Sequence, residues 1–331
     1  MQYAGKFVRA FDGLAAAGVA VVLALGSLPA QAQSYPTKPI RIVVGFAPGG
    51  PSDIISRLAG AKMGEILGQQ FVIENKSGAG GTIATETVAR SDPDGYTILN
   101  TPLANAVNET LSTSLKYKIG DGIIAVAPLA QTANVLVVHP SLAVKSVAEL
   151  IALAKARPGE LLYASAGRGS ATHLASELFN MMAGTKIGPV HYKGGGDALK
   201  DLLSGQVKIM FSSIAPVLSF VRTGSLIGLA TTGLERDPAL PDLVTLSESS
   251  LPGFDVRLWQ GFTAPAGVPR PVVEKLAAAT AQALNAPDVK ESLANQGFSP
   301  LSGTPEEFDA FYRNEVAKWR KVIETSGMTS Q

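Results

Sequence analysis

Glycine-rich turns that lead into helical patterns recur four times along this chain. Each follows a short apolar run, and the turns occupy residues 45–52, 77–82, 165–170 and 193–196. Such a turn exposes backbone N–H groups, and the first turn of the helix behind it adds unpaired donors and roughly half a positive charge. A carboxylate can bind there without a metal. One turn of this kind is usually only conformational, but four in one chain predict a shared pocket for a small organic acid.

Hydroxyl side chains in and beside these turns suit an acid that is already ionised, because each hydroxyl can donate a hydrogen bond to a carboxylate oxygen. They are Ser52, Ser77, Ser165, Ser170 and Thr172. Ser52 and Ser170 each precede a helical pattern, so helix N-capping is the alternative interpretation for both.

The charged and titratable residues near the turns each have two interpretations. Lys193 either contacts the acid or lies in solvent at a turn, and the same holds for Arg168, which is flanked by glycines. Asp53 fits the first turn of its helix better than an anion contact, because two negative charges repel. His173 lies in the first turns of a helix beside the predicted pocket.

The patterns of common catalytic and cofactor sites are incomplete. Residues 45–52 have the glycine spacing of a P-loop, but Pro51 replaces its lysine. Residues 78–80 and 167–169 lack the third glycine of a dinucleotide fingerprint, and no Gly-x-Ser-x-Gly elbow is present. The three histidines have no metal-ligand spacing. We therefore expect no catalytic residues, no metal and no cofactor. An enzyme, the alternative, would convert a bound acid rather than return it unchanged.

The first 32 residues have the pattern of a secretory signal peptide. Lys6 and Arg9 precede an apolar stretch at 14–28, and Ala30-Gln31-Ala32 has the small-x-small pattern of a cleavage site. A membrane anchor is the alternative, but the apolar stretch is shorter than the ~20 residues that span a bilayer. No cysteine follows it, so lipid attachment through an N-terminal cysteine is excluded. We expect an exported, soluble mature protein that begins near Gln33.

Composition excludes several other classes of protein. Without residues 1–32, the chain has 26 basic and 26 acidic side chains, which makes nucleic acid an unsuitable partner. The absence of cysteine excludes disulfides, thiolate metal sites and cysteine nucleophiles. Stability must therefore come from an apolar core, which a chain of 46% hydrophobic residues can supply.

Strand-like runs alternate with helical patterns, which predicts an α/β fold with parallel βαβ units. Strands are expected at residues 40–44, 71–74, 96–99, 135–138, 161–164, 190–192, 207–211 and 226–231. Helices are expected at residues 53–67, 83–90, 171–182, 198–204, 271–284 and 287–295, after Ser146 as far as Pro158, and after Thr304. Ser146 with Glu149 and Thr304 with Glu307 match the capping box. Trp319 and Phe311 should pack the last helix onto the core.

The element order predicts two α/β domains with the glycine-rich turns at the carboxyl ends of strands, which places the site in the cleft between them. We expect a signal peptide at 1–32, a first domain at 33–138 plus 257–331, and a second domain at 139–256. Residues 233–255 have little periodicity and are interpreted as a connection that returns to the first domain.

Several segments also carry a family resemblance. They are YPTKPIRIVV at 35–44 followed by GFAPGGPSD at 45–53, SGAGG at 77–81, VVHPS at 137–141, YASAGRGS at 163–170, HYKG at 191–194 and GFTAPAGVP at 261–269. In this order and spacing, the chain resembles the Bug-type (TctC-like) periplasmic solute-binding proteins of the tripartite tricarboxylate transporter (TTT) family over essentially the whole mature sequence.

The resemblance implies a two-domain periplasmic-binding-protein (Venus-flytrap) fold, with two crossover strands and a mainly parallel sheet flanked by helices in each domain. It implies a monomer that binds a small organic carboxylate, partly through ordered waters, and delivers it to TctA/TctB-like membrane subunits. A sensor component that presents its ligand to a membrane signalling receptor is the alternative. The ligand-binding residues it implies are Phe46, Ala47, Pro48, Gly49, Gly50, Ser52, Ser77, Gly78, Ala79, Gly80, Thr101, Asn105, Ser165, Gly167, Gly169, Ser170, Thr172, Tyr192, Lys193, Gly194 and Gly195.

Two stretches depart from the family pattern. Ser212-Ser213 follows residues 207–211, where many members carry an acidic residue that meets a ligand amine. This departure disfavours an amino-acid ligand. Residues 101–105 differ from the usual Ser/Thr/His-rich stretch, and the sequence does not identify the acid.

Overall fold

The computed structural model describes residues 35–112, 115, 117–192 and 194–328. The predicted signal peptide, residues 1–32, lies outside this range. The chain divides into two units, Met1–Thr37 and Lys38–Gln331. Every helix and strand described here belongs to the second unit. None of the helices in the described residues is both long enough and apolar enough to cross a membrane.

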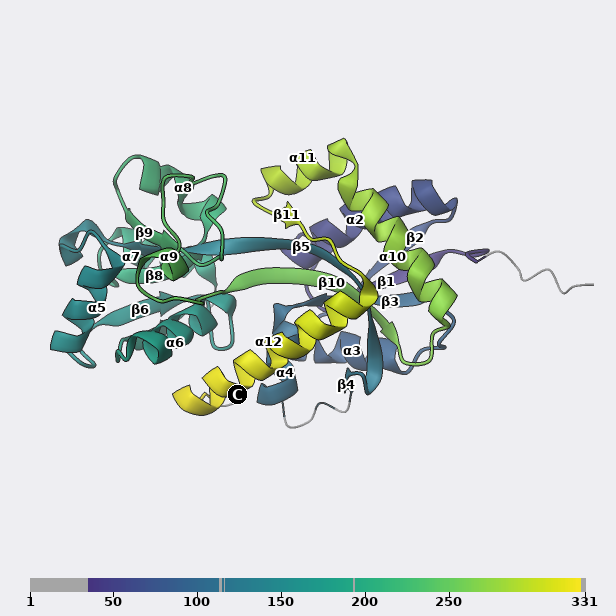
Figure 1. Cartoon of the computed structure of the whole chain (residues 1–331), viewed down its shortest axis with the longest axis horizontal. Helices are drawn as coiled ribbons and strands as arrows, with labels where there is room; N and C mark the ends of the chain where they lie inside the picture. Colours follow the sequence, from purple (N-terminus) through teal and green to yellow (C-terminus); the bar gives the residue numbers. More distant parts are fainter. Residues whose placement is uncertain (1–34, 113–114, 116, 193, 329–331) are drawn as a thin grey trace, which may run out of the picture. The chain divides into compact units, whose positions relative to one another are not determined.

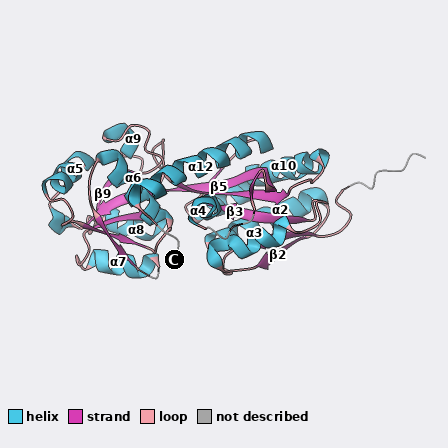
Figure 2. Ribbon diagram, turned by 90° about the horizontal axis from the view of Figure 1, so that it is seen from below, coloured by secondary structure: helices cyan, strands magenta, loops and turns pink. Residues whose placement is uncertain are grey.

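The first group of strands forms a sheet in which β1 lies between β2 and β3, all parallel. The strands are β1 (Ile40–Val44), β2 (Phe71–Asn75) and β3 (Thr97–Pro102), and the helices between them are α2 (Pro51–Leu67) and α3 (Thr82–Ala89). Alternate residues of β1 face opposite sides: Ile42 lies close to α2 at Gly60, and Val43 joins a buried cluster with Ala84 and Val88 of α3. Helices therefore cover both faces of this sheet, as Figure 2 also shows.

The second group of strands repeats this layering. It contains β6 (Leu162–Ser165), β7 (Gly188–His191), β8 (Ile209–Ser213) and β9 (Ile227–Thr231), with helices α5 (Val147–Ala156), α6 (Ala171–Ala183), α7 (Gly195–Leu203) and α8 (Ile214–Arg222). Strand β6 pairs in parallel with β7 and β8. Residues of α5 and α6 share one core with Leu136, whereas residues of α7 and α8 share another with Val135.

One long strand, β5 (Gly122–Val138), joins the two groups (Figure 1). Its first part, through Ala133, pairs with β10 (Arg257–Pro265), and its last part, from Asn134, pairs with β8 and β9. The short strands β4 (Lys118–Ile119) and β11 (Ser299–Pro300) also pair with β5. This arrangement confirms the predicted α/β class. The domain boundaries given above stay a prediction.

Thr232 ties the two connecting segments together. Its buried hydroxyl accepts the Asn134 N–H at 2.8 Å and donates to the Val256 carbonyl at 2.6 Å. The Thr232 backbone also donates to the Asn134 carbonyl and accepts from the Val256 N–H, each at 2.9 Å. The chain therefore crosses between the strand groups at a point where four hydrogen bonds meet.

The C-terminal helices complete the core. They are α10 (Arg270–Asn285), α11 (Pro287–Asn295) and α12 (Pro305–Ser326). Thr304 and Glu307 form the predicted capping box. The indole N–H groups of Trp259 and Trp319 both donate to Glu315 Oε2, at 2.8 and 3.0 Å. Trp319 is fully buried and the Phe311 ring lies against Trp259, which confirms that these side chains pack α12 onto the core.

Several predicted elements need correction. Helix α4 (Leu103–Leu111), the short helix α9 (Leu246–Ser249) within the supposed connection, and residues 122–134 of β5 were not expected. Residues 123–130 of β5 are largely buried on both faces of the strand. Polar and apolar residues therefore do not alternate there, and the alternation that usually indicates a strand is missing. Ser146 caps α5 as predicted, but the Glu149 carboxylate accepts from Lys145 N–H instead of closing a capping box.

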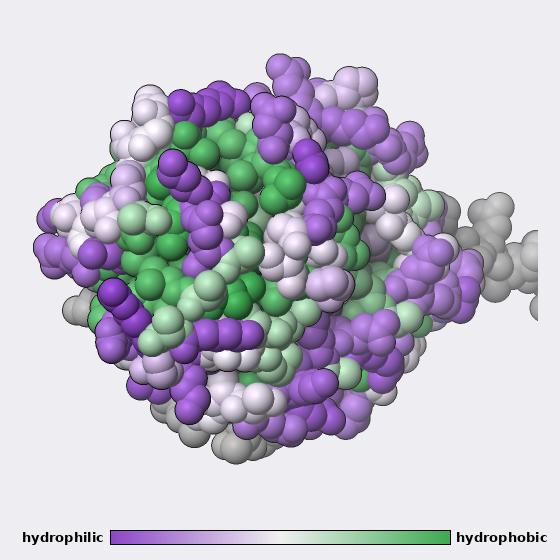
Figure 3. All heavy atoms as spheres, turned by 60° about the vertical axis from the view of Figure 1, so that its left-hand side comes forward, coloured by the Kyte–Doolittle hydropathy of each residue, from purple (hydrophilic) through white to green (hydrophobic). Residues whose placement is uncertain are grey.

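Hydrophobic residues reach the surface between charged ones on the face shown in Figure 3. Four large apolar side chains in the described residues are at least 45% exposed, and they lie on different elements or loops: Val72, Ile83, Leu162 and Leu234. Such scattered positions are ordinary for a protein surface.

Candidate functional site

The first glycine-rich turn follows β1 and is held by one buried carboxylate. Asp53, 3% exposed, accepts hydrogen bonds from Gly49 N–H (2.9 Å), Arg57 Nε (2.9 Å) and Asn75 Nδ2 (3.0 Å). Asn75 Nδ2 also lies 3.0 Å from the Phe46 carbonyl oxygen, to which it donates. These contacts fix the turn from residue 46 to residue 49 against β2.

Asp53 is confirmed as a residue that stabilises the first turn of its helix. The hydrogen bond from Arg57 lowers the pKa of this carboxyl to about 2, with burial opposing the shift and the Gly49 and Asn75 hydrogen bonds adding to it. N-capping by Ser52 is wrong, because Gly50 is the cap and Ser52 lies buried inside α2. Pro51 explains the difference, since proline is favoured at the first helical position and starts the helix earlier.

The second turn lies directly against the first. It contains a short 3₁₀ segment, η1 (Ala79–Gly81), in which the backbone at Gly80 and Gly81 has φ of +63° and +95°. A Cβ placed on Gly45 would lie 2.8 Å from Gly81 Cα, and one on Gly81 would lie 3.4 Å from the Phe46 ring. The predicted residues 46–50 and 78–80 therefore come together. Ser77 lies exposed at the start of the second turn.

Helix α4 supports this pair of turns. Asn105 Nδ2 donates to Thr85 Oγ1 at 2.7 Å, and Asn108 Nδ2 donates to the Gly80 carbonyl at 2.7 Å. Asn108 was missed by the sequence prediction, although it lies one helical turn after Asn105, on the same face. Thr101, also predicted, is different: its hydroxyl hydrogen-bonds to the Thr263 hydroxyl at 2.7 Å within the sheet.

The third turn, residues 165–170, is held by neutral side chains. Its N–H donors meet acceptors on residues that flank it: Ala166 N–H to Thr172 Oγ1 (2.9 Å), Gly167 N–H to Ser165 Oγ (3.3 Å) and Gly169 N–H to His173 Nδ1 (3.0 Å). The alternative role predicted for Ser170 is confirmed, because it caps α6 by accepting from the His173 N–H. Most hydroxyls predicted for the ligand therefore already have partners inside the protein.

Three N–H groups at this turn remain available. Within the described residues, no protein acceptor bonds to the backbone N–H of Arg168 or to those of Ala171 and Thr172 in the first turn of α6. The exposed Arg168 side chain has no ion-pair partner there either. Among the described residues, the turn thus presents a cation without an ion-pair partner beside free helix N-terminal donors, which is a suitable arrangement for an anion.

The fourth turn adjoins the third. Tyr192 N–H donates to the Ser165 carbonyl at 3.0 Å, and a Cβ on Gly167 would lie 3.4 Å from the Tyr192 carbonyl oxygen. The Tyr192 hydroxyl donates to Asp201 on α7 at 2.8 Å, and burial, with Asp201, raises its pKa to about 12. Gly194 caps α7 and Gly195 begins it. Lys193 lies outside the described residues.

Helix α4 also reaches the third turn. A Cβ on Gly169 would lie 3.5 Å from Leu111 Cδ1, and Leu111 is the last residue of α4. The same helix holds Gly80 through Asn108, three residues before Leu111. The structure therefore assembles the predicted residues into two clusters, one from the first and second turns and one from the third and fourth, with α4 contacting both.

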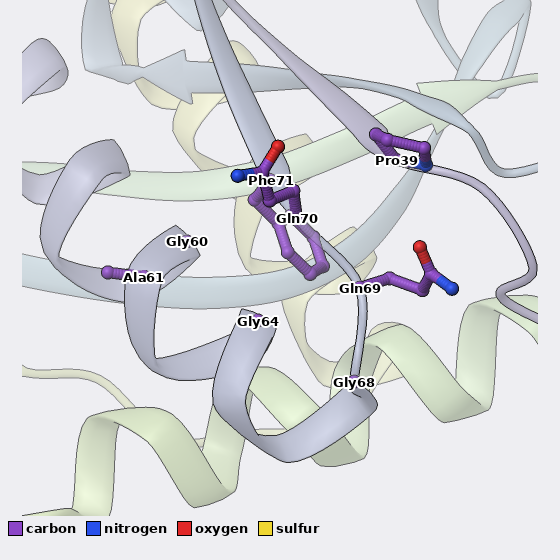
Figure 4. A pocket seen from close by; sticks show the side chains of 8 residues that line it. All are labelled: Pro39, Gly60, Ala61, Gly64, Gly68, Gln69, Gln70 and Phe71. Atoms are coloured by element: carbon purple, nitrogen blue, oxygen red, sulfur yellow. The ribbon is translucent and has the colours of Figure 1, made fainter.

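A hollow of about 570 Å³ lies away from these clusters, between α2 and the start of β2 (Figure 4). Three glycines of one helix face and the Gln69 and Gln70 segment line it, without a charged side chain. It therefore has no cation that would recognise an acid. No group of three potential ligands in the described residues is arranged to hold a metal ion.

The family model of the tripartite tricarboxylate transporter family receptor matches residues 55–328. The chain belongs to this family. It is 35% identical over 318 residues to the protein BugT of Bordetella pertussis, with 95% of this chain and 97% of that protein covered. It is 36% identical over 309 residues to a protein from the tcbD-tcbE intergenic region of a Pseudomonas strain, with 93% of this chain and 92% of that protein covered.

Several solved structures of similar sequence have the same fold. The periplasmic binding protein BugD is 32% identical, with 90% of this chain and 100% of that chain covered and a TM-score of 0.71. An R. palustris protein, Rpa4515, solved with adipate, is 34% identical over 90% of this chain and 100% of that chain, with a TM-score of 0.74. MatC from the same species, solved with malate, is 33% identical over 87% of this chain and 100% of that chain, with a TM-score of 0.71.

These similarities confirm the family resemblance and the two-domain periplasmic-binding-protein fold. The chain is a TctC-family solute-binding protein, and the family and fold are those of binding proteins rather than enzymes. Two of the similar solved structures, Rpa4515 and MatC, contain the dicarboxylates adipate and malate.

Proposed function

We propose that this protein captures a small organic carboxylate in the periplasm and delivers it, as a monomer, to the TctA/TctB-like membrane subunits of a tripartite tricarboxylate transporter. The observation that carries the proposal is the pair of clusters that α4 contacts, each built on glycine-rich turns at the carboxyl ends of strands. In the second cluster, the backbone N–H groups of Arg168, Ala171 and Thr172 have no protein acceptor among the described residues, and such donors recognise an anion. The carboxylates bound by two relatives support the same ligand class.

The ligand's carboxylate is assigned to residues 46–50 and 77–80 of the first cluster, and the rest of the ligand to residues 165–172 and 192–195. A ligand that binds both clusters at once favours the conformation in which the clusters face each other, because only in that conformation can the ligand contact both. Since Asn105 and Thr101 already have hydrogen-bond partners, they shape the edge of the site rather than supply its first donors.

A thermal-shift screen tests the ligand class. The mature protein, unfolded and refolded to remove bound ligand, is screened against mono-, di- and tricarboxylates, acidic amino acids and aromatic acids. A ligand at a hundred times its dissociation constant stabilises the native state by about 2.7 kcal/mol. A selective shift with one class of acid supports the proposal. If a well-refolded sample shows no thermal shift with any of these acids, the result contradicts the proposal.

Gly50→Val tests the assignment of the first cluster. A Cβ on Gly50 would lie 3.3 Å from the Ala47 carbonyl oxygen, and its backbone does not need a glycine. We expect a folded protein with at least tenfold weaker ligand binding. Gly303→Val is the matched control, since a Cβ there would lie at the same 3.3 Å from Glu307 Oε2, away from both clusters. Equal affinities of both variants and the parent would contradict the assignment.

Export and partner need separate measurements. Expression of the full chain in a Gram-negative host, followed by N-terminal sequencing of the periplasmic form, should give Gln33 or a neighbour as the first residue. Crosslinking in membranes that hold the encoded transporter should then capture its subunits. Capture of a sensor kinase instead would support the alternative role in signalling.

A further inference from the structure

We propose that His173 is a positioning residue, which holds the turn at 165–170 in the shape that presents the N–H groups of Arg168, Ala171 and Thr172 to the ligand. The inference rests on the proposed function, because it assigns a role within the second cluster of that site. His173 itself does not need to touch the ligand.

A hydrogen bond at Nδ1 orients the His173 ring. The side chain is buried, and Nδ1 accepts the Gly169 N–H at 3.0 Å, so Nδ1 carries no proton and Nε2 does. Nε2 lies 4.0 Å from Glu177 Oε1, one helical turn along α6. The same oxygen accepts the Tyr163 hydroxyl at 2.5 Å, which fixes the Glu177 side chain against β6.

A second histidine holds the other end of the turn. His191 packs edge-on against His173, with ring centroids 4.7 Å apart and an interplanar angle of 83°. Its Nδ1 lies 2.8 Å from Ser165 Oγ, and that oxygen accepts the Gly167 N–H at 3.3 Å. The two glycines of the turn are therefore both anchored, one by His173 directly and one by His191 through Ser165.

Both anchored glycines have a backbone that other residues rarely adopt, with φ of +129° at Gly167 and +69° at Gly169. Glycine is the residue with the most backbone freedom, so a turn with two glycines has many alternative backbone conformations unless other residues hold it. Ser165 and His173 accept the N–H groups of Gly167 and Gly169, so these two N–H groups are not available to a ligand. The N–H of Arg168, which lies between them, then has a defined direction.

The surroundings keep both rings neutral, and the hydrogen bond that Nδ1 of His173 accepts requires this of His173. Burial, and then the charges of His191 and Arg168, lower the pKa of His173 to about 4. Burial and Arg168 also lower the pKa of His191. The titratable groups that face His173 are Arg168 from the turn, His191 from β7, Glu177 from α6 and Tyr163 from β6. At neutral pH, Nδ1 of His173 is therefore an acceptor.

Two substitutions separate positioning from general packing. His173→Leu keeps apolar volume but removes the acceptor, and His173→Asn places an amide oxygen near the position of Nδ1. By calorimetry with malate and adipate as probes, we expect about tenfold weaker binding for the leucine variant, the size of one lost hydrogen bond. The asparagine variant should bind within about threefold of the parent.

His139 supplies a matched control. Its Nδ1 also accepts a backbone N–H, that of Ser141 at 3.2 Å, but it lies outside the proposed site. His139→Leu should bind the probe as the parent does. Equal affinities of His173→Leu and the parent would overturn the inference, and so would a His173→Asn variant as weak as His173→Leu, since that result points to packing alone.

Hydrogen exchange at Gly169 gives a readout that needs no ligand. The Gly169 amide should exchange slowly in the parent and in His173→Asn, and at least tenfold faster in His173→Leu. If the parent binds no acid of the thermal-shift screen, the proposed function fails, and the exchange rates still report whether His173 holds the turn. Uniform exchange rates in all three proteins would overturn the inference whatever the ligand.

Discussion

The two clusters of glycine-rich turns are similar in sequence but differ in what holds them. The buried Asp53 carboxylate, paired with the largely exposed Arg57 side chain, anchors the first turn, with Asn75 as a neutral bridge. In the third turn, every anchor is neutral: Thr172, Ser165 and His173 accept its N–H groups. Two glycine-rich turns therefore use a charge in one case and uncharged acceptors in the other.

The difference suits the charges that surround each turn. A carboxylate in the first turn of a helix interacts favourably with the helix dipole, so Asp53 stabilises α2 as well as the turn. A carboxylate in the third turn would lie beside Arg168 and the free N–H donors, where it would compete with an anionic ligand. Neutral acceptors leave those donors and that cation available. The comparison thus predicts that the two clusters lose stability in different pH ranges as the pH falls, and that charge removal affects the first turn.

The largest expected effect is acid destabilisation through His173. Its pKa is about 4 in the folded protein and about 6.5 in an unfolded chain, so the unfolded chain binds the extra proton first as the pH falls. Stability is therefore complete above pH 6.5 and is lost between pH 6.5 and pH 4, by about 3 kcal/mol. Urea unfolding at pH 7, 5.5 and 4.5 measures this loss.

His173→Asn removes the titrating group and should flatten the stability curve in that pH window. Asp53 contributes in a different range, because its pKa of about 2 lies below the ordinary value of 3.8. Its contribution persists down to about pH 4 and is lost as the pH falls further toward 2. A parent protein that is equally stable at pH 7 and pH 4.5 would contradict a buried neutral histidine.

The second effect concerns charge removal at the first turn. Asp53→Asn leaves one oxygen for three donors and places an amide N–H₂ against Arg57, so we expect a loss of about 2 kcal/mol in unfolding free energy at pH 7. Ligand binding should weaken as well, because the turn loses its anchor. Asp288→Asn is the control: Asp288 also pairs with a cation, Lys62, but it is exposed, and little change is expected. Similar losses for both variants would mean that burial of Asp53 contributes nothing.

The same contrast explains which features the sequence could predict. The strand at 40–44 and the cap at Thr304 depend on local patterns, and both were predicted correctly. Strand residues 122–134 and helix α4 were not, since β5 runs between two sheets and α4 lies next to a strand end without a capping residue. The partners of the turns were missed for a similar reason. Asn75, Asn108 and His191 reach the turns across the fold, and no local pattern marks those contacts.

The smallest effect compares two N-caps. Ser170 caps α6 beside the third turn, and Thr304 caps α12 away from both clusters. Replacing either by alanine should cost about 1 kcal/mol of unfolding free energy. Only Ser170→Ala should also change ligand affinity, because its hydroxyl contacts Thr172, which in turn accepts the Ala166 N–H. Calorimetry on both variants measures the difference. If Thr304→Ala weakens binding as much as Ser170→Ala does, affinity follows global stability, and the neutral anchors of the third turn have no specific role in recognition.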